Sequence, residues 1–437
     1  MQIADTIYAL SSGRLPSGVA VVRLSGPSVR FVIETIAGSV PAPGRISVKR
    51  LRASDGTVLD TALVAYFEAP RSFSGEDCGE FHVHGGRAIV DALLRAISEI
   101  EGTRLAEAGE FTRRAFLNGK LDLVQAEALA DLIEAETEAQ RRMAVYAAEG
   151  HVSRRYERWR SQILRIQAAI TADLDFGDEG DVPDSVAERV RQDIAEVHSE
   201  LEKHLASQRQ AEIIRDGFRV AIIGRPNAGK SSLLNTLAGR DVAIVTDEPG
   251  TTRDLVEVSL DLGGLKIIVT DTAGIRENAG AVERIGIARA LQSAKTANLV
   301  LQLRPDDGGG ELTEAEWVDS IFVLSKCDLG DVSGGKGDAD VRVSALTGEG
   351  IDGLLEIIRV KAQQATESVD LGPQRLRHRD ALRRCAAALH RAQTVEMPLE
   401  LRAEELRIAA TELGRVTGRI DVEEVLGEVF RAFCIGK

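Results

Sequence analysis

The stretch Gly224-Arg-Pro-Asn-Ala-Gly-Lys-Ser-Ser232 decides the fold of the central part of this chain. It directly follows the apolar run Phe-Arg-Val-Ala-Ile-Ile over residues 218–223, which is typical of a buried strand. A strand that turns through G-x-x-x-x-G-K-S into a helix presents backbone N–H groups, a lysine and a hydroxyl to the phosphates of a nucleotide. In this interpretation the two glycines let the backbone approach the phosphates, Lys230 neutralises the β and γ oxygens, and Ser231 ligates Mg²⁺. A glycine-rich turn of another α/β unit is the alternative, but strand, motif and the following helix former Leu-Leu-Asn all favour the phosphate loop.

Residues 215–366 continue as an α/β domain with a parallel sheet, because strand-like runs alternate with helical ones. Three runs lead into short polar motifs: Asp271-Thr-Ala-Gly274, Ser325-Lys-Cys-Asp328 and Ser344-Ala-Leu346. This order of motifs after a phosphate loop is typical of a GTPase. The strands expected after the loop are residues 258–262, 265–270, 299–303, 321–324 and 341–343.

The run Gly250-Thr-Thr-Arg-Asp254 has the composition of a switch segment, in which Thr251 and Thr252 supply a hydroxyl to Mg²⁺. No arginine is clearly placed as a catalytic finger, although Arg253 and Arg276 lie in switch-like segments. We therefore expect another cation to neutralise the charge that develops in the transition state.

The motif that begins at Asp271 can hold a metal-bound water near the γ phosphate. Ile275 follows it where a Ras-like enzyme has a glutamine that orients the attacking water. Glu283 is the nearest acidic candidate for that role, and its alternative is an exposed charge on a helix.

Composition limits the class of protein. With 437 residues, about three domains are expected. The net charge of −14 argues against a protein that simply coats nucleic acid, and the aromatic share of 4% argues against stacking platforms for single strands. The cysteines lie far apart without a C-x-x-C motif, and neither a secretory leader nor a membrane-spanning run is visible, so a reduced cytoplasm is expected. His82 and His84 alternate on one strand face, but a third metal ligand at suitable spacing is missing.

Residues 1–120 have the pattern of an α+β domain. The expected elements are strands over residues 19–24 and 63–67 and a helix over residues 88–100. Three charged residues, Arg23, Glu80 and Lys120, interrupt this pattern. From their chemistry alone, a solvated strand end or a satisfied ion pair is the more ordinary interpretation than a ligand contact.

The remaining segments are helical. Residues 121–174 form a long helical stretch that stops at the acidic run 173–183, which we interpret as a solvated loop. A further amphipathic helix is expected over residues 184–214, and residues 373–437 return to helix. Near the end of the chain Cys434 has the ordinary interpretation of a buried small hydrophobe.

Taken together, the motifs closely resemble one family, the bacterial tRNA-modification GTPases called MnmE or TrmE. The resemblance covers essentially the whole chain and implies a multidomain fold. It implies an α+β folate-binding and dimerisation domain over residues 1–120, an all-α helical domain over 121–214 and 367–437, and an inserted Ras-like α/β G domain over 215–366. Besides the GTPase motifs it rests on residues 5–10, 18–27, 74–80, 84–86 and 109–122 and on the terminal Cys434-Ile-Gly-Lys437.

The resemblance also implies cofactors and partners. A 5-formyl-tetrahydrofolate or related folate is expected at Arg23, Glu80 and Lys120, with Lys437 nearby, which reverses the interpretation of these charges. Cys434 is then expected near the one-carbon chemistry. The family forms a homodimer and works in a heterotetramer with the FAD-dependent protein MnmG (GidA). Together they install an aminomethyl or carboxymethylaminomethyl group on the wobble uridine of certain tRNAs.

For the GTPase, the resemblance implies activation by K⁺-dependent dimerisation of the G domains. The expected K⁺ ligands are Asn227, Thr246, Glu248 and Thr251. The expected Mg²⁺ ligands are Ser231 and Thr252, and the expected catalytic residues are Lys230, Thr252, Asp271, Glu283 as the water-orienting glutamate, and Cys434. The residues expected to line GTP are Asn227, Ala228, Gly229, Lys230, Ser231, Ser232, Thr246, Asp247, Glu248, Pro249, Gly250, Thr251, Thr252, Asp271, Thr272, Ala273, Gly274, Ser325, Lys326, Asp328, Ser344, Ala345 and Leu346.

Two departures from the family pattern bear on nucleotide affinity. Ser325 stands where the guanine motif N-K-x-D has asparagine, and the loss of that side chain is expected to cost about 1–3 kcal/mol of nucleotide binding. Asp328 can still accept from the guanine N1 and N2 groups, which keeps selectivity against adenine. Because Ser325→Asn restores the usual side chain, we expect this variant to bind GDP more tightly. The segment 304–320 is also short.

Two other functions stay open at this point. One is a ribosome-assembly GTPase that binds RNA without modifying it, which folate binding through Arg23 would argue against. The other is a scaffold GTPase with degraded turnover, suggested by Ser325, and the retained Lys230, Thr252, Asp271 and Glu283 weigh against it.

Overall fold

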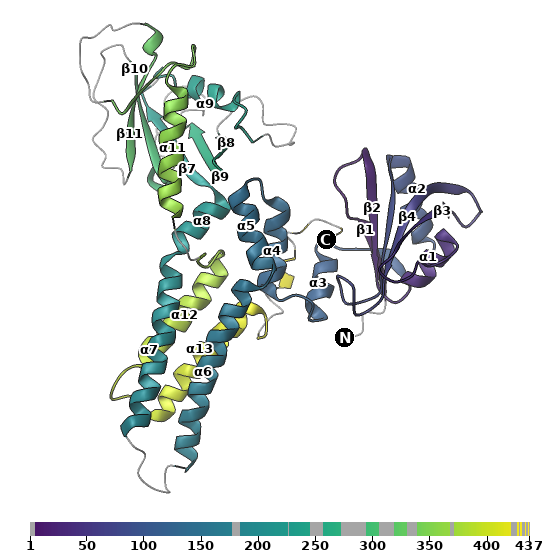
Figure 1. The fold of residues 1–437 in the computed structure, drawn as a ribbon, viewed down its shortest axis with the longest axis horizontal. Coiled ribbons are helices and arrows are strands. Elements are labelled where there is room, and N and C mark those ends of the chain that lie inside the picture. The colour runs from purple at the N-terminus through teal and green to yellow at the C-terminus, as the bar shows by residue number, and fades with distance from the viewer. Residues whose placement is uncertain are drawn as a thin grey trace, which may run out of the picture. The chain divides into compact units, whose positions relative to one another are not determined.

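The computed structural model describes residues 5–176, 184–225, 227–244, 257–271, 294–305, 319–329, 339–367 and 371–420, together with 426–427, 429–430, 433 and 436. The chain folds into two compact units, each assembled from separate stretches of sequence (Figure 1). The first comprises Met1–Ile133, Val145–Val182 and Glu396–Lys437, and the second comprises Glu134–Ala144 and Pro183–Val395. The predicted fold class, with α+β, all-α and α/β parts, is confirmed.

A six-stranded sheet forms the N-terminal part of the first unit. Its strands, in spatial order, are β3 (Ile46–Arg52), β4 (Val58–Phe67), β5 (Cys78–Gly85), β2 (Ser17–Ser25), β1 (Thr6–Leu10) and β6 (Thr103–Leu105). All neighbours are antiparallel except β1 and β6. Helices α1 (Val29–Ala37) and α2 (Arg87–Ser98) bury one face, where Val22, Val64 and Phe81 pack with Val32 and Leu93. Apolar and polar residues alternate along these strands, and the apolar ones point to this face and form the core.

The register places polar and apolar side chains together on the other face of this sheet. Val48 pairs with Leu63, Leu63 with His82, and His82 with Val21, so the four lie in one row across four strands. Val48 is 68% exposed and Leu63 43%. An open, partly apolar surface of this kind is unusual for a sheet face that remains in water.

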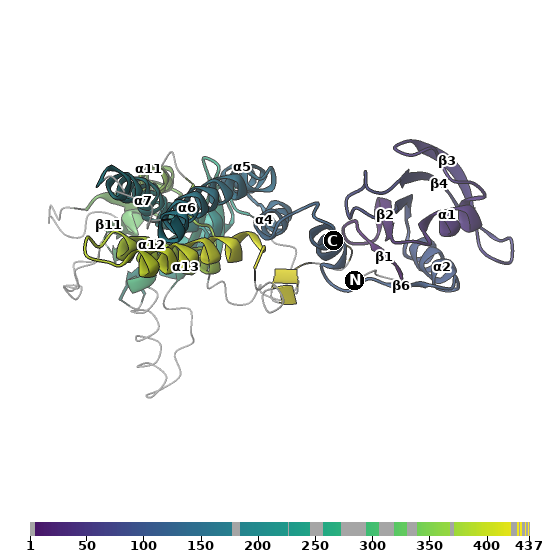
Figure 2. The same cartoon turned by 90° about the horizontal axis from the view of Figure 1, so that it is seen from below.

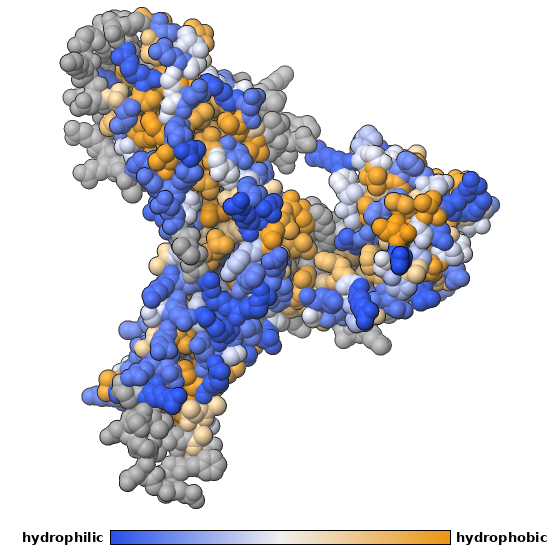
Figure 3. Space-filling model, viewed as in Figure 1, coloured by the Kyte–Doolittle hydropathy of each residue, from blue (hydrophilic) through white to orange (hydrophobic). Residues whose placement is uncertain are grey.

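Further helices lie in the described residues of the first unit. They are α3 (Glu110–Leu117), α4 (Leu123–Glu134), α6 (His151–Phe176) and α13 (Leu399–Thr417), and α6 and α13 lie side by side (Figure 2). Trp159 and Tyr156 of α6 and Leu406 and Leu413 of α13 are buried. The surfaces of α6 and α7 that face the viewer in Figure 3 are mainly hydrophilic, as expected for amphipathic helices that pack along one stripe.

The predicted helical stretch 121–174 consists of three helices, α4, α5 (Glu138–Ala148) and α6. Before α5 the backbone N–H groups of Glu136 and Thr137 donate to the side chain of Gln140 at 2.9 and 3.2 Å, which starts a new helix. After α5 the chain passes through Gly150, whose φ of +80° favours glycine and interrupts the helix. The expected stop at Asp173 is wrong because α6 continues to Phe176, and residues 177–183 of the acidic run lie outside the described part.

In the second unit, α7 (Asp184–Ala206) pairs with α12 (Leu376–Ala392), and α8 (Gln208–Asp216) leads to the central sheet. The prediction of a single helix over 184–214 is wrong, because the chain breaks at Ser207, whose hydroxyl donates to the His204 carbonyl at 2.8 Å. Gly372 packs against this break, since a Cβ atom there would lie 2.7 Å from the Ser207 carbonyl carbon. The chain therefore enters the α/β region at Ser207 and leaves it at Gly372, and these two residues are in contact.

The second sheet is the one predicted around the phosphate loop. Its spatial order is β12 (Val341–Val343), β11 (Ser320–Ser325), β10 (Leu299–Pro305), β7 (Phe218–Gly224), β9 (Leu265–Asp271) and β8 (Glu257–Leu262), with only β8 antiparallel. Helices α9 (Lys230–Ala238) and α11 (Ile351–Thr366) pack on it, and Ile222, Leu301, Leu233 and Ile358 contribute to its core. Parallel strands buried on both faces explain the continuous apolar runs in the sequence. None of the described helices combines the length and hydropathy that a bilayer-spanning helix requires.

Candidate functional site

The phosphate loop joins β7 to α9 in the conformation that its sequence predicts. Asn227 has a φ of +62° and Gly229 a φ of +89°, both in the left-handed region that asparagine and glycine tolerate best. Gly229 is the N-cap residue of α9. The loop therefore leads directly into the N-terminus of α9, and backbone N–H groups at a helix N-terminus bind anions.

Lys230 lies within this loop and only 6% of it is exposed. Its Nζ donates to the carbonyl oxygens of Gly224 and Arg225, both at 2.9 Å. These bonds hold a positive charge at the carboxyl end of β7. A lysine ammonium at this place can neutralise phosphate oxygens.

Ser231 and Asp271 bring an alcohol and a carboxylate together beside the loop. The Ser231 hydroxyl donates to Asp271 Oδ2 at 2.6 Å, and Asp271 is 1% exposed. Hydroxyl and carboxylate oxygens are the ligands that Mg²⁺ prefers. The residues present therefore fit a magnesium ion next to the phosphate loop.

The guanine motif lies at the end of the neighbouring part of the sheet. Ser325, at the end of β11, donates from its hydroxyl to the Ala228 carbonyl oxygen at 2.7 Å. Asp328 is exposed and accepts from the Ser344 hydroxyl at 2.5 Å. Sequence reasoning treated Ser325 only as the loss of an asparagine, whereas its hydroxyl reaches the phosphate loop.

Two roles in this region could not be read from the sequence. Packing requires a glycine at position 224, because a Cβ atom there would lie 2.7 Å from the Leu303 carbonyl oxygen on β10. Thr236 of α9 donates toward the Ala345 carbonyl oxygen at 2.9 Å. Both contacts join residues far apart in the chain, so no local pattern signals them.

A second polar site occupies the open face of the N-terminal sheet. Arg23 forms an ion pair with Glu80 at 3.1 Å, and its guanidinium lies over the rings of Phe73 and Phe111, 5.5 and 6.0 Å from their centroids. The other carboxylate oxygen of Glu80 lies 3.0 Å from His82 Nε2. A paired charge held on aromatic rings is suited to a planar polar ligand.

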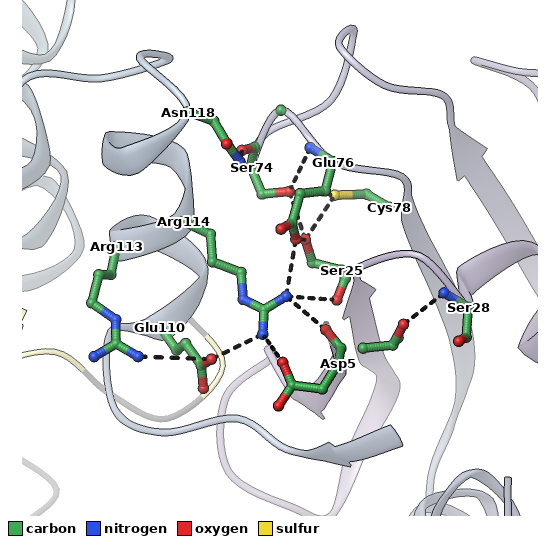
Figure 4. Close-up of polar contacts among 12 residues, drawn as sticks. Asp5, Ser25, Ser28, Ser74, Glu76, Cys78, Glu110, Arg113, Arg114 and Asn118 are labelled. Carbon is green, nitrogen blue, oxygen red and sulfur yellow. Dashed lines mark hydrogen bonds and ion pairs between the residues drawn. The ribbon is translucent and has the colours of Figure 1, made fainter. Parts of the chain in front are cut away.

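The loop beside this site is held by a buried arginine (Figure 4). Arg114 is completely buried and forms ion pairs with Asp5, Glu76 and Glu110 at 3.1, 3.1 and 3.0 Å. Although burial alone would raise the pKa of Glu110, hydrogen bonds from Arg104, from the Glu107 backbone and from Arg114 lower it to about 2. Glu76 also accepts from the Ser25 hydroxyl at 2.7 Å, so the network joins α3, β2 and the loop before β5. Lys120 also contacts that loop, since its Nζ donates to the Pro70 carbonyl oxygen at 3.0 Å.

Curated proteins match the chain over its whole length. "tRNA modification GTPase MnmE" of Brucella anthropi is 52% identical over 445 residues, which covers 100% of this chain and 99% of that protein. The chain belongs to the MnmE family. The proteins of the same name from Brucella canis and Brucella melitensis are each 50% identical, with 99% of this chain and 98% of theirs covered.

Two family models match consecutive parts of the chain. "GTP-binding protein TrmE N-terminus" matches residues 6–120, and "MnmE helical domain" matches residues 123–434. Among solved structures, an Era variant of Aquifex aeolicus bound to GDP and AlF₄⁻ is 26% identical at a TM-score of 0.27, covering 41% of this chain and 69% of that one. The G domain of the T. maritima FeoB iron transporter is 25% identical at a TM-score of 0.25, covering 34% and 98%.

Gly436, within the C-terminal motif that carries part of the MnmE resemblance, lies close to the N-terminal sheet. The Ser11 hydroxyl donates to the Gly436 carbonyl oxygen at 2.7 Å. Gly436 has a φ of +99°, and a Cβ atom there would lie 2.2 Å from the Leu10 carbonyl oxygen. Phe430 and Phe433 pack with Ala126 of α4. Gly436 is thus held close to the end of β1 within the first unit.

Several residues expected from the MnmE resemblance lie outside the described part, as does most of the short segment 304–320. They are Thr246, Asp247, Glu248, Pro249, Gly250, Thr251, Thr252, Thr272, Ala273, Gly274, Glu283, Cys434 and Lys437. The residues that the structure does bring together are Lys230, Ser231 and Asp271 at the phosphate loop and Arg23 and Glu80 on the N-terminal sheet. The roles of both groups, and the domain boundaries, stay predictions.

Proposed function

We propose that this protein hydrolyses GTP to GDP and phosphate and uses this reaction in the modification of the wobble uridine of tRNAs. The observation that carries the proposal is the contact of Ser231 with Asp271 beside Lys230, in a chain 52% identical over its whole length to a tRNA modification GTPase. A cation, a hydroxyl and a carboxylate already meet there at the end of a helix-capping loop. This is the arrangement that phosphoryl transfer requires, because catalysis depends mainly on positioning and charge.

At this site each residue of the chain has a defined task. Lys230 and the N-terminal N–H groups of α9 bind and orient the phosphates. Ser231 and Thr252 would hold Mg²⁺, Asp271 orients the Ser231 hydroxyl, and the ion would supply charge neutralisation when it is bound. Glu283 orients the attacking water, and Asp328 selects guanine by accepting from its N1 and N2 groups.

The proposal includes K⁺ at Asn227, Thr246, Glu248 and Thr251, where the ion supplies the positive charge that an arginine finger would bring. In support, Asn227 has the left-handed conformation that turns the loop at this position. Binding of K⁺ is proposed to accompany dimerisation of the G domains, which links hydrolysis to a conformational change.

The N-terminal sheet is proposed to bind a 5-formyl-tetrahydrofolate or related folate. Glu80 accepts from the donor edge of the pterin, while Arg23, Lys120 and Lys437 bind the carboxylates of the glutamate tail. The ion pair of Arg23 with Glu80 supports this assignment, because ligand and protein can exchange partners without leaving a charge unpaired. Cys434 acts near the one-carbon unit of the folate.

The proposed assembly is a homodimer that joins an FAD-dependent protein of the MnmG (GidA) type in a heterotetramer, binds tRNA and works in the cytoplasm. The open face of the N-terminal sheet supports the homodimer. Its exposed Ile46, Val48 and Leu63 form an apolar surface that a second copy would cover.

Steady-state GTP hydrolysis in K⁺ against Na⁺, at matched ionic strength, tests the first part of this proposal. We expect strong acceleration by K⁺ and loss of hydrolysis in Lys230→Ala. A slow rate that is independent of the cation would contradict the K⁺ site, and hydrolysis unaffected by Lys230→Ala would contradict the active site. For the tRNA reaction, the purified protein and its partner are incubated with tRNA, GTP and the folate, and the wobble nucleoside is analysed by mass spectrometry. Unmodified uridine in the complete mixture would contradict the proposed modification.

A further inference from the structure

Three side-chain hydroxyls join the loops that contain the guanine motifs to the phosphate loop and its helix. The first is Ser325, which is 5% exposed and donates to the carbonyl oxygen of Ala228 at 2.7 Å. Ala228 immediately precedes Gly229, the N-cap of α9. Ser325 thus fixes the end of β11 to the turn of the phosphate loop.

The second hydroxyl belongs to Thr236, six positions beyond Lys230 on α9. Its Oγ1 lies 2.9 Å from the Ser232 carbonyl oxygen of its own helix and 2.9 Å from the Ala345 carbonyl oxygen. A threonine inside a helix ordinarily bonds only to the carbonyl four residues earlier. The contact with Ala345 is an additional one, and it joins α9 to the loop between β12 and α11.

The third hydroxyl, that of Ser344, completes the ring. Ser344 is fully buried and donates to Asp328 Oδ1 at 2.5 Å, and it accepts from the Thr347 backbone N–H at 3.1 Å. Gly350 lets the loop pack tightly against β12, because a Cβ atom at this position would lie 1.8 Å from the Arg342 carbonyl oxygen. The Asp328 carboxylate is thus connected to α9 by two routes, through β11 and Ser325 and through Ser344 and Thr236.

We propose that Thr236 and Ser325 are positioning residues that fix the Asp328 carboxylate relative to the phosphate loop. The inference rests on the proposed GTP-binding function and adds how this chain keeps guanine recognition without the usual asparagine. Because the loops are joined before a ligand arrives, less ordering is required when a nucleotide binds. The ring acts on nucleotide affinity and base selectivity, because it joins the loop that carries Asp328 to the phosphate loop and its helix.

The test compares binding of GDP and IDP to full-length protein by calorimetry. IDP lacks the 2-amino group from which Asp328 accepts, so the ratio of the two dissociation constants reports the position of that carboxylate. We expect Thr236→Val and Ser325→Ala each to weaken GDP binding about three- to tenfold, the effect of one lost hydrogen bond. The GDP to IDP selectivity should fall in both variants. Because the two residues support the same carboxylate, the effect of the double variant should differ from the product of the single effects.

Two controls separate positioning from a general structural effect. Thr236→Ser keeps the hydroxyl and should restore both affinity and selectivity. Thr366→Val removes a hydroxyl that bonds only to its own helix, to the carbonyls of Ala362 and Gln363, and should leave both unchanged.

Equal losses for GDP and IDP in Thr236→Val, or no loss at all, would overturn the inference, and so would strict additivity in the double variant. Wild-type protein that fails to bind GDP would instead refute the proposed function, and the inference with it. A fall in selectivity that Thr236→Ser reverses would support the inference.

Discussion

Arg23 and Glu80 are direct partners in the register of β2 and β5, and their side chains form an ion pair on the open face of the N-terminal sheet. Cross-strand pairs of opposite charge stabilise a sheet only modestly. This pair is different, because aromatic rings lie under the guanidinium and His82 lies beside the carboxylate. We therefore propose that it serves as a binding element as well as a structural one.

Arg23→Ala should weaken binding of 5-formyl-tetrahydrofolate about 10- to 100-fold, which corresponds to the loss of one or two charge-assisted hydrogen bonds. Isothermal titration calorimetry measures the change. Arg50→Ala is the matched control, since Arg50 is an exposed arginine of β3 on the same face, and it should leave affinity unchanged. Similar affinities for all three proteins would argue against the folate site.

Ser231→Ala should raise the Mg²⁺ concentration at which GTP hydrolysis is half-maximal and lower the maximal rate. The reason is that the variant lacks the Ser231 hydroxyl, a proposed Mg²⁺ ligand that donates to Asp271 at 2.6 Å. Ser231→Thr keeps a hydroxyl and should recover most of the activity. An unchanged magnesium dependence in Ser231→Ala would show that the ion binds elsewhere.

Gly436→Ala should detach the C-terminal motif from the N-terminal sheet, because the new methyl group would collide with the Leu10 carbonyl oxygen. We expect tRNA modification to be lost, GTP hydrolysis to continue, and the C-terminus to become sensitive to carboxypeptidase. Gly427→Ala is a suitable control within the same tail, since no atom lies within 4 Å of its added Cβ position. Retained modification in Gly436→Ala would mean that the docked motif is not needed for the reaction.

Glu110→Gln should destabilise the first unit by about 2–4 kcal/mol at pH 7, because it leaves the buried Arg114 with one carboxylate fewer. The pKa of Glu110 is about 2 in the folded state against an ordinary 4.5. A depressed folded-state pKa stabilises the protein fully above pH 4.5, and this stabilisation is lost as the pH falls toward 2. Urea unfolding should therefore show a difference between variant and wild type that narrows below pH 4.5. A gap that stays constant down to pH 3 would contradict this account.

Glu138→Gln provides the contrast for this prediction. The pKa of Glu138 is also about 2, because hydrogen bonds from Arg141 and Arg142 lower it, yet its ion pairs are exposed to solvent. Screened surface pairs contribute little to stability. We therefore expect almost no change in urea unfolding for this variant.

Local sequence patterns were enough to predict those helices and strands whose signal lies within a short stretch of sequence. The strand, loop and helix around Lys230 were predicted because motif and apolar run are adjacent. The later G-domain strands were predicted because each is a short stretch rich in apolar residues. The breaks at Gly150 and Ser207 were missed, since the apolar spacing of the helices continues across them. Strand β3 was not predicted either, because its outer residues are apolar and obscure the alternation.

For the sites, chemistry could be predicted but partners could not. The carboxylate of Asp271 and the hydroxyl of Ser231 were assigned from their motifs, and the structure adds that they touch. The contacts of Arg114 with Asp5 and Glu76 and the contact of Thr236 with Ala345 had no local signal, because these partners are 109, 38 and 109 positions away. Such contacts follow from the fold and not from any single stretch.

The close approach of Gly372 to Ser207 has a consequence for how this gene could be rearranged. Residues 208–371 begin and end at the same point, so their removal would leave two ends that a peptide bond or a very short linker can join. Helices α7 and α12 would then follow one another as an ordinary helical hairpin. The segment between these two residues therefore has the geometry of an insertion into a helical hairpin.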